Sequence, residues 1–259
     1  MASVRLDKFI SERTEYTRSQ IRQLCAKGSV SVNGSTVKKS DTKIDTGKDS
    51  VTVCGNTLQE SRYRYILLNK PQGYVSSTED DDGESVLKLV PPELRTKGLF
   101  PAGRLDKDST GALLITDDGE LAHRILSPKH HLAKIYIVKL ARPFENNYVN
   151  NFREGIVLSN GETCLPAKVR QAENSDKLAF VELHEGKYHQ VRRMFAAVGN
   201  HVEALMRVSV GGLILPETLA SGQCMCLLTK DVENLFCPLD FDIFFTRFGN
   251  YFSAILINM

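Results

Sequence analysis

The chain has 259 residues, of which 42% are hydrophobic and 25% charged, and its net charge is +2. These are the proportions of an ordinary soluble protein with a sizeable core, and the length is typical of two domains. The charge is uneven, because residues 1–60 carry 10 Lys/Arg against 7 Asp/Glu (+3) and the rest carry 23 against 24 (−1). A basic N-terminal segment fits either a phosphate-binding surface or a solvated face.

The cysteines and histidines argue against a metal site and against secretion. The six cysteines contain no C-x-x-C pair, and the N-terminus has no apolar leader segment, so we expect a cytoplasmic protein with free thiols. Cys224 and Cys226 have strand spacing and fit packed side chains better than metal ligands. In "HEGKYH", four residues separate His184 from His189, which is not the i, i+4 spacing of a zinc helix.

The first 55 residues predict two helices followed by a hairpin. Apolar residues at i, i+3 and i+4 indicate a short amphipathic helix over Leu6–Ile10. Thr17 is the expected N-cap of a second helix that runs to about Lys27. The alternating segment Val30–Val32, followed by Asn33-Gly34, predicts a tight hairpin.

Basic residues gather on the second helix and the hairpin arm. Together, "RLDKFI" and "TRSQIRQLCAKGSVSVNG" resemble the S4 RNA-binding domain over roughly residues 3–55. The resemblance implies binding to structured RNA, mainly through its phosphates. The residues expected to bind RNA are Arg18, Arg22, Lys27, Lys38 and Lys39.

After a polar segment, the remaining chain predicts an α+β domain with a mixed, mainly antiparallel sheet, because short strands outnumber helices without strict alternation. Helices are expected over Asp117–Ser127, with Asp117 and Glu120 as a capping box, and over Val191–Val198. The aromatic tail 237–259 contains charges and is no membrane span; it fits a packed helix, a packed strand or a poorly ordered extension. The expected strands are Leu113–Thr116, Ile135–Leu140, Ala167–Gln171 and Ala179–His184.

One acidic residue stands apart in "AGRLDKDSTGALLITDDGELAHRI". Asp117 and Asp118 end a strand and cap a helix, and Asp108 fits turn chemistry. Asp106 has no such role. From residue types alone, both a catalytic and a surface role for Asp106 remain open.

Three segments carry a resemblance to the RsuA-type pseudouridine synthases. They are "NKPQGYVSS", "GRLDKDSTGALLITDDGELAHRILSPKHHLAKIYIV" and "EGKYHQVRRMFAAVGNHV", in the family's order and behind an S4-like segment. "SPKHHLAKIY" and the third segment look most like the branch that acts on small-subunit ribosomal RNA. The implied organisation is an S4-like domain (1–55), a linker (56–63), a catalytic domain of the pseudouridine synthase type (64–236) and an extension outside the resemblance (237–259).

The resemblance also implies a reaction and its residues. A uridine in RNA would become pseudouridine, with Asp106 as nucleophile at C1′ or as base at C2′, Tyr136 against the uracil, and Arg192 as the cation that keeps Asp106 ionised. We expect Arg104, Lys134 and His189 to contact the substrate, with Arg104 on the same strand face as Asp106 if that stretch is extended. No cofactor and no metal are expected.

The expected partner is ribosomal RNA, either small-subunit rRNA or a partly assembled subunit. We expect the protein to be a monomer and to have no membrane partner. Three alternatives remain open: a synthase acting on large-subunit rRNA, an inactive RNA-binding assembly factor, and a glycosidic hydrolase. The hydrolase is disfavoured because no second acid has an evident catalytic placement.

Overall fold

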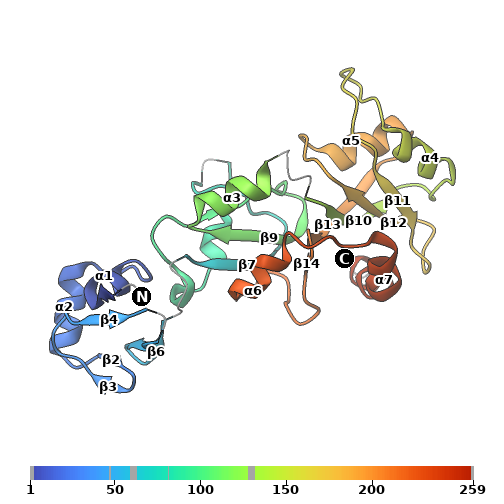
Figure 1. Ribbon diagram of the computed structural model, residues 1–259. Coiled ribbons are helices and arrows are strands. Elements are labelled where there is room, and N and C mark those ends of the chain that lie inside the picture. The colour runs from blue at the N-terminus through green and yellow to red at the C-terminus, as the bar shows by residue number, and fades with distance from the viewer. Residues whose placement is uncertain (1–2, 47, 59–62, 81, 128–131, 258–259) are drawn as a thin grey trace.

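The computed structural model describes residues 3–46, 48–58, 63–80, 82–127 and 132–257. Figure 1 shows a small N-terminal unit, hereafter the head, beside a larger elongated unit, hereafter the body. The guanidinium of Arg64 connects them, because its Nη2 donates to the carbonyl oxygen of Arg13 at 3.2 Å. The α+β class and the mainly antiparallel sheet of the body are confirmed. Within the described residues, no helix has the length and apolar character needed to cross a bilayer.

The head has the predicted helices and hairpin. Thr17 caps the second helix in a reciprocal capping box with Gln20, and Asn33 and Gly34 have φ of 51° and 78°, which closes the tight turn. Strand β6 pairs with β5, so the head's sheet continues past the expected boundary at residue 55. Its elements are β1 Ser3–Arg5, α1 Leu6–Ser11, α2 Arg18–Ala26, β2 Val30–Val32, β3 Ser35–Thr36, β4 Lys43–Asp45, β5 Val51–Val53 and β6 Asn56–Thr57.

The body is built on one nine-stranded sheet. Seven strands follow the order β11-β12-β10-β13-β9-β7-β15, while β14 pairs with β13 and β8 with β9. All pairs are antiparallel except β13 with β9. The strands are β7 Tyr65–Lys70, β8 Phe100–Pro101, β9 Thr110–Thr116, β10 Lys134–Leu140, β11 Lys168–Gln171, β12 Leu178–Leu183, β13 Val202–Val210, β14 Leu213–Ile214 and β15 Cys224–Cys226.

The N-cap of one helix in the body differs from the residue that the sequence predicts. Asp118, and not Asp117, caps α3, because its Oδ1 accepts from the backbone amides of Glu120 and Leu121. Asp117 is used instead to hold the Arg64 amide and the Thr96 hydroxyl. The α-helices are α3 Gly119–Leu126, α4 Asn147–Glu154, α5 Gln190–Ala197, α6 Thr229–Asn234 and α7 Phe241–Ile257; the 3₁₀ helices are η1 Val86–Leu89 and η2 Pro92–Leu94.

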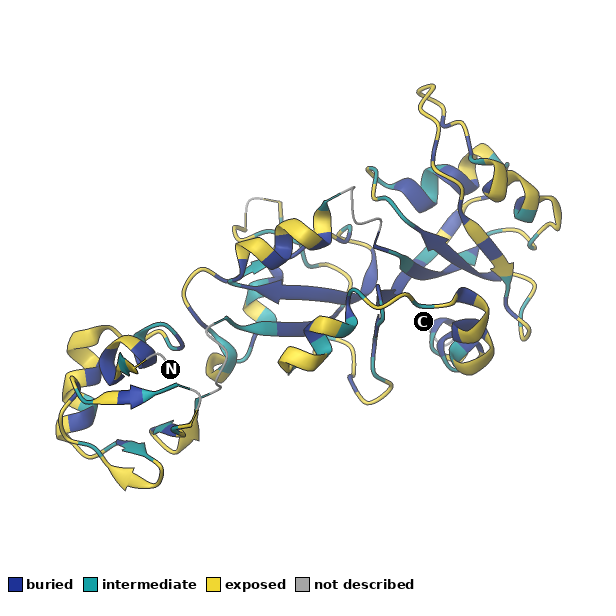
Figure 2. Cartoon of the chain, viewed as in Figure 1, coloured by how far each residue is buried: buried dark blue, intermediate teal, exposed yellow. Residues whose placement is uncertain are grey.

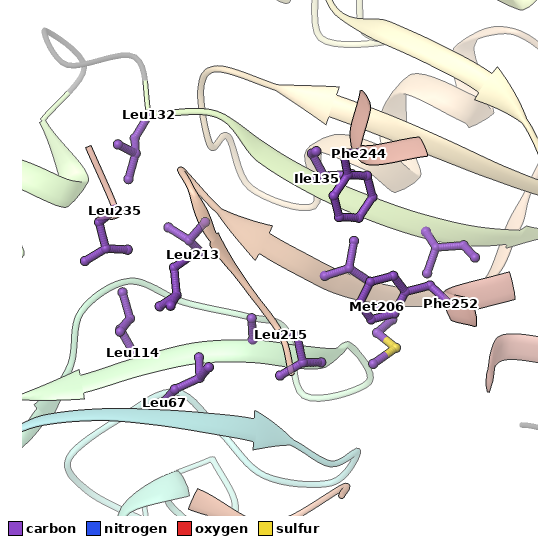
Figure 3. Close-up of a cluster of buried hydrophobic side chains, with 14 of the residues drawn as sticks. Leu67, Leu114, Leu132, Ile135, Met206, Leu213, Leu215, Leu235, Phe244 and Phe252 are labelled. Carbon is purple, nitrogen blue, oxygen red and sulfur yellow. The ribbon is translucent and has the colours of Figure 1, made fainter. Parts of the chain in front are cut away.

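The sheet is covered by apolar clusters on both faces, as the buried strands in Figure 2 show. Along β9, Leu114 belongs to one cluster and Leu113 to the other, as the alternation of a strand requires. The aromatic tail forms α7 and closes one cluster. Figure 3 shows Phe244 and Phe252 of this helix beside Ile135 and Met206 of the sheet.

The parallel junction between β13 and β9 positions the site. Strands β13 and β9 pair only at Met206 with Thr110 and at Arg207 with Gly111. Gly111 has φ of +100°, and a Cβ there would collide with the carbonyl oxygen of Arg207. Glycine is therefore required for the two strands to approach. The close approach brings the loop before β9 against β13, where Arg207 Nη1 donates to the carbonyl oxygen of Arg104.

Candidate active site

A cavity of about 730 Å³ opens where this junction meets the loop before β9. Residues 76–78, 100–106 and 185–191 form much of its wall, so all three sequence segments singled out above contribute to it. Five of the charged or aromatic residues that line it are Asp106, Lys134, Tyr136, His189 and Arg207.

The loop that carries Asp106 has no regular secondary structure but is held along its whole length. Six consecutive carbonyl oxygens, from residue 104 to residue 109, accept a hydrogen bond from outside the loop. The Ser76 hydroxyl also accepts from the Leu105 amide at 3.0 Å. A carboxylate on such a loop is preorganised, because its backbone has no alternative partners to exchange. The donors to residues 104–109 in order are Arg207, Ser76, Lys70, Gly73 with Lys70, Gln72, and Lys70.

Lys70 is the central anchor of this loop. Its side chain is fully buried, and its Nζ donates to the carbonyl oxygens of Ser109 at 2.7 Å and Asp106 at 3.0 Å. Burial lowers the pKa of Lys70 to about 8, while the carboxylates of Asp108 and Asp106 act in the opposite direction. Lys70 comes from the "NKPQG" segment, which thus supports the loop that carries Asp106.

The imidazole of His189 faces Asp106. Its Nε2 lies 3.5 Å from Asp106 Oδ1, and the two side chains are 38% and 30% exposed. The backbone of His189 is left-handed (φ 48°, ψ 35°) where it enters α5, an uncommon conformation for a residue with a Cβ. This turn aims the imidazole at the loop.

The expected pairing of Arg192 with Asp106 is wrong for this structure. Arg192 Nη2 lies 2.7 Å from Asp108 Oδ2, and Nη1 donates to the carbonyl oxygen of Val202 at 2.9 Å. The physical reason is register, because His189 occupies the space before Asp106, while Arg192 lies one helical turn further along and meets the next acid of the loop. Arg192 does not line the cavity.

Tyr136 and Lys134 enter the cavity from the same face of β10, two residues apart. The Tyr136 side chain is almost buried, at 8% exposure. Burial first and the nearby Arg207 second lower the pKa of Lys134 to about 8, although Glu185 raises it. The pKa of this ammonium group in the cavity is therefore well below that of an exposed lysine.

Arg207 was missed by the sequence reasoning, although an arginine inside the apolar run "VEALMRVSV" was a signal. It is 4% exposed, and its Nε donates to the carbonyl oxygen of Ala112 at 2.8 Å. Its Nη1 donates to the carbonyl oxygen of Arg104 at 3.3 Å. Residues 104–106 are not a strand, so the expected common strand face of Arg104 and Asp106 is absent, yet both line the cavity.

The histidines, cysteines and acidic residues do not gather into a metal site in the described part of the chain. In the part of the chain that the structure describes, no group of three or more His, Cys, Asp or Glu could hold a metal ion. Cys224 donates to the carbonyl oxygen of Leu89 at 3.6 Å, and burial raises its pKa to about 11.

The residues of the head that are expected to bind RNA are all exposed. They are Arg18, Arg22, Lys27, Lys38 and Lys39.

Comparison with known proteins agrees with this geometry. Residues 64–197 match the RNA pseudouridylate synthase family, and residues 4–50 match the S4 domain. The chain belongs to the RNA pseudouridylate synthase family. It is therefore an isomerase with an appended S4 domain.

Similar proteins align over nearly their whole length. A ribosomal small subunit pseudouridine synthase A from Yersinia pestis is 41% identical over 238 residues, which is 91% of this chain and 99% of that protein. An uncharacterized RNA pseudouridine synthase from Bacillus subtilis, YtzG, is 37% identical over 234 residues, covering 90% and 98%. A pseudouridylate synthase crystal structure is similar with a TM-score of 0.62 and 40% identity, covering 90% of this chain and 100% of that one.

Proposed function

We propose that this enzyme converts a uridine of small-subunit ribosomal RNA to pseudouridine, with Asp106 as its catalytic carboxylate. The observation that carries the proposal is the cavity itself. In it, Asp106 stands on a loop held by hydrogen bonds, and Tyr136, Lys134 and Arg207 also line the wall. The RNA class follows from relatives named ribosomal small subunit pseudouridine synthase A, such as those of Yersinia pestis and Escherichia coli.

The reaction needs a carboxylate but no water. The C1′–N1 bond breaks, the uracil turns, C5 bonds to C1′, and the C5 proton is lost while N1 gains one. Asp106 either attacks C1′ or removes the C2′ proton, and both routes use the same ionised group. Tyr136 would stack on the uracil, and its hydroxyl would remove the C5 proton. Exclusion of water from the cavity by the bound RNA would also prevent hydrolysis to an abasic site.

The cations of the site have separate tasks in this proposal. Lys134 and Arg104 bind the substrate, with the ammonium of Lys134 stabilising negative charge on the detached uracil. His189 contacts both Asp106 and the bound nucleotide. Arg192 acts from beside the site, because its contact with Asp108 places a positive charge two residues from Asp106 without occupying the cavity.

A glycosidic hydrolase is less consistent with the cavity. Such an enzyme needs a second carboxyl group that activates water. Glu185 also lines the cavity, but its Oε1 accepts from the Leu165 amide at 2.9 Å and from Gln190 Nε2 at 2.6 Å. Because Glu185 Oε1 accepts these two hydrogen bonds, the side chain holds a loop in place and is poorly suited to activate water.

The head would supply affinity through phosphate contacts. The target base must leave its stack to reach Asp106, at a cost of a few kcal/mol that is lowest in loops and bulges. The enzyme should therefore select a folded site, with the exposed cations of the head neutralising nearby phosphates.

The test is to incubate the full chain with small-subunit rRNA, or with a partly assembled small subunit, and to map pseudouridine chemically. Large-subunit rRNA and Asp106→Asn serve as matched controls. One new pseudouridine in small-subunit rRNA, absent with Asp106→Asn, is the expected result. Modification of large-subunit rRNA alone would move the enzyme to the other branch, and an RNA that is bound but never modified would identify an inactive assembly factor.

A further inference from the structure

At the mouth of the cavity, one aromatic side chain is left open to solvent. Tyr188 is 75% exposed, the highest value among the large hydrophobic side chains in the described ranges. Its ring stacks on His189, with centroids 3.9 Å apart and planes 14° apart, and both residues line the cavity. An aromatic ring that is exposed at the edge of a cavity has a face available for stacking on a ligand.

The loop that presents Tyr188 is held in place. The buried side chain of Gln190 accepts from the Lys187 amide at 2.9 Å and donates to Glu185 Oε1 at 2.6 Å, which fastens both ends of the turn. Arg193 Nη1 donates to the carbonyl oxygen of Tyr188 at 3.3 Å. The exposed ring therefore stands on a constrained backbone, so little conformational entropy remains to be lost on binding.

The left-handed backbone of His189 explains the stack. In an extended chain, neighbouring side chains point to opposite sides, whereas φ of 48° at His189 allows its ring to lie against that of Tyr188. The imidazole at the same time lies 3.5 Å from Asp106. His189 therefore lies between the Asp106 carboxylate and the exposed ring of Tyr188, and it contacts both.

We propose that Tyr188 is a stacking subsite for an unpaired RNA base that neighbours the target uridine. The inference rests on the proposed function only in that the ligand is RNA. Removing the target base from its stack leaves its neighbour without a stacking partner, and an aromatic face replaces that partner for any base. Lys187 and Arg104 also line the cavity, and this positive charge suits a phosphate backbone better than an apolar protein surface.

The first test compares Tyr188→Ala, Tyr188→Phe and Tyr188→Leu in the full-length enzyme, on a naked RNA fragment that the wild type modifies. Tyr188→Ala should raise KM by about 5-fold to 150-fold, the range of base–aromatic stacking, with kcat largely kept. Phe should restore wild-type KM because its ring face remains, and Leu should resemble Ala. Ile243→Ala, at a 67% exposed position on α7, is the control and should change neither constant.

The second test removes the base instead of the ring. An abasic nucleotide is placed on either side of the target uridine in turn. At the stacked position it should raise KM for the wild type and add nothing to Tyr188→Ala, since the two changes remove one contact. Independent, additive effects at both positions would overturn the proposal.

Other outcomes are equally decisive. A fall in kcat at unchanged KM would show that Tyr188 acts through His189 on Asp106 and binds no base. An effect on assembled subunits but not on naked RNA would identify a protein contact. If the wild type modifies an RNA other than small-subunit rRNA, the proposed function fails, while the same variants on that RNA still decide the role of Tyr188.

Discussion

The cations of the head that are expected to bind RNA and the cations of the body that hold the Asp106 loop lie in opposite environments. Arg18 and Arg22 of the head are exposed on α2, whereas Lys70 and Arg207 of the body are buried and bonded to backbone carbonyls. A solvated cation attracts phosphate, loses strength in salt and tolerates replacement. A buried cation fixes geometry, and its removal leaves polar groups without partners. The head is thus suited to affinity and the body to chemistry.

The largest effect is expected at Asp106. Asp106→Asn keeps the side-chain shape and removes the charge, so turnover should be abolished while the fold and RNA binding survive. Chemical mapping of pseudouridine, thermal melting and filter binding measure the three properties. Substantial product from a clean preparation would show that another group is the catalyst.

Arg192 tests whether a cation beside the cavity supports the carboxylate. Arg192→Ala should lower activity severely, because Asp108 loses its ion-pair partner and adds an uncompensated negative charge near Asp106. Arg192→Lys should lower it less, since a point charge remains. The measurement is the single-turnover rate of both variants. Equal losses would mean that the two-sided contact with Asp108 and Val202 matters more than the charge.

Lys70 tests the buried anchor. Lys70→Met removes the donor to Asp106 and Ser109, so the loop should shift and kcat should fall by roughly 100-fold, the cost typical of a 1 Å misplacement. Lys97→Met, at an exposed position, is the matched control. Kinetics and melting are measured together. Unchanged kcat would show that the other donors hold the loop without Lys70.

The lowered pKa of Lys134 predicts a pH dependence with a defined sign. Its ammonium is charged below about pH 8 and neutral above it, so activity should decline above that pH, at most tenfold per pH unit. Stability changes the other way, because a lysine with a lowered folded pKa binds fewer protons when folded, and unfolding becomes less favourable between pH 8 and 10.5. Lys134→Arg stays charged and should lose the decline in activity. A decline that persists in Lys134→Arg belongs to another group, including the RNA.

The smallest effects belong to single cations of the head. Replacing Arg18, Arg22, Lys27, Lys38 or Lys39 by Ala should weaken binding alike for all RNA sequences, since phosphates carry no sequence information. Each lost contact should flatten the plot of log affinity against log salt by about 0.7 to 0.9. Salt titrations of binding measure this slope. A variant that changed sequence preference at constant slope would place that residue on a base.

Local sequence signals were reliable where local chemistry decides the structure. Thr17 and the Asn33-Gly34 pair specify a cap and a turn within four residues, and the structure has both. The N-cap of α3 was harder to predict, because either Asp117 or Asp118 can cap it. In the structure, Asp117 accepts from the backbone amide of Arg64, which is distant in sequence, and Asp118 caps the helix. The secondary structure of the aromatic tail could not be predicted either, because it depends on contacts with residues distant in sequence. Its helix is defined by the sheet face that Phe244 and Phe252 cover.

The sequence by itself determined the fold class, the S4-like head and the order of the three segments that line the cavity, because these depend on patterns within short stretches. Tertiary structure alone decided the partners of the site. The partners that depend on the parallel junction at Gly111 are the carboxylate that meets Arg192, the side chain that faces Asp106, and the anchors Lys70 and Arg207 of the loop. That junction joins strands about 95 residues apart, and no local pattern encodes the register of such a contact.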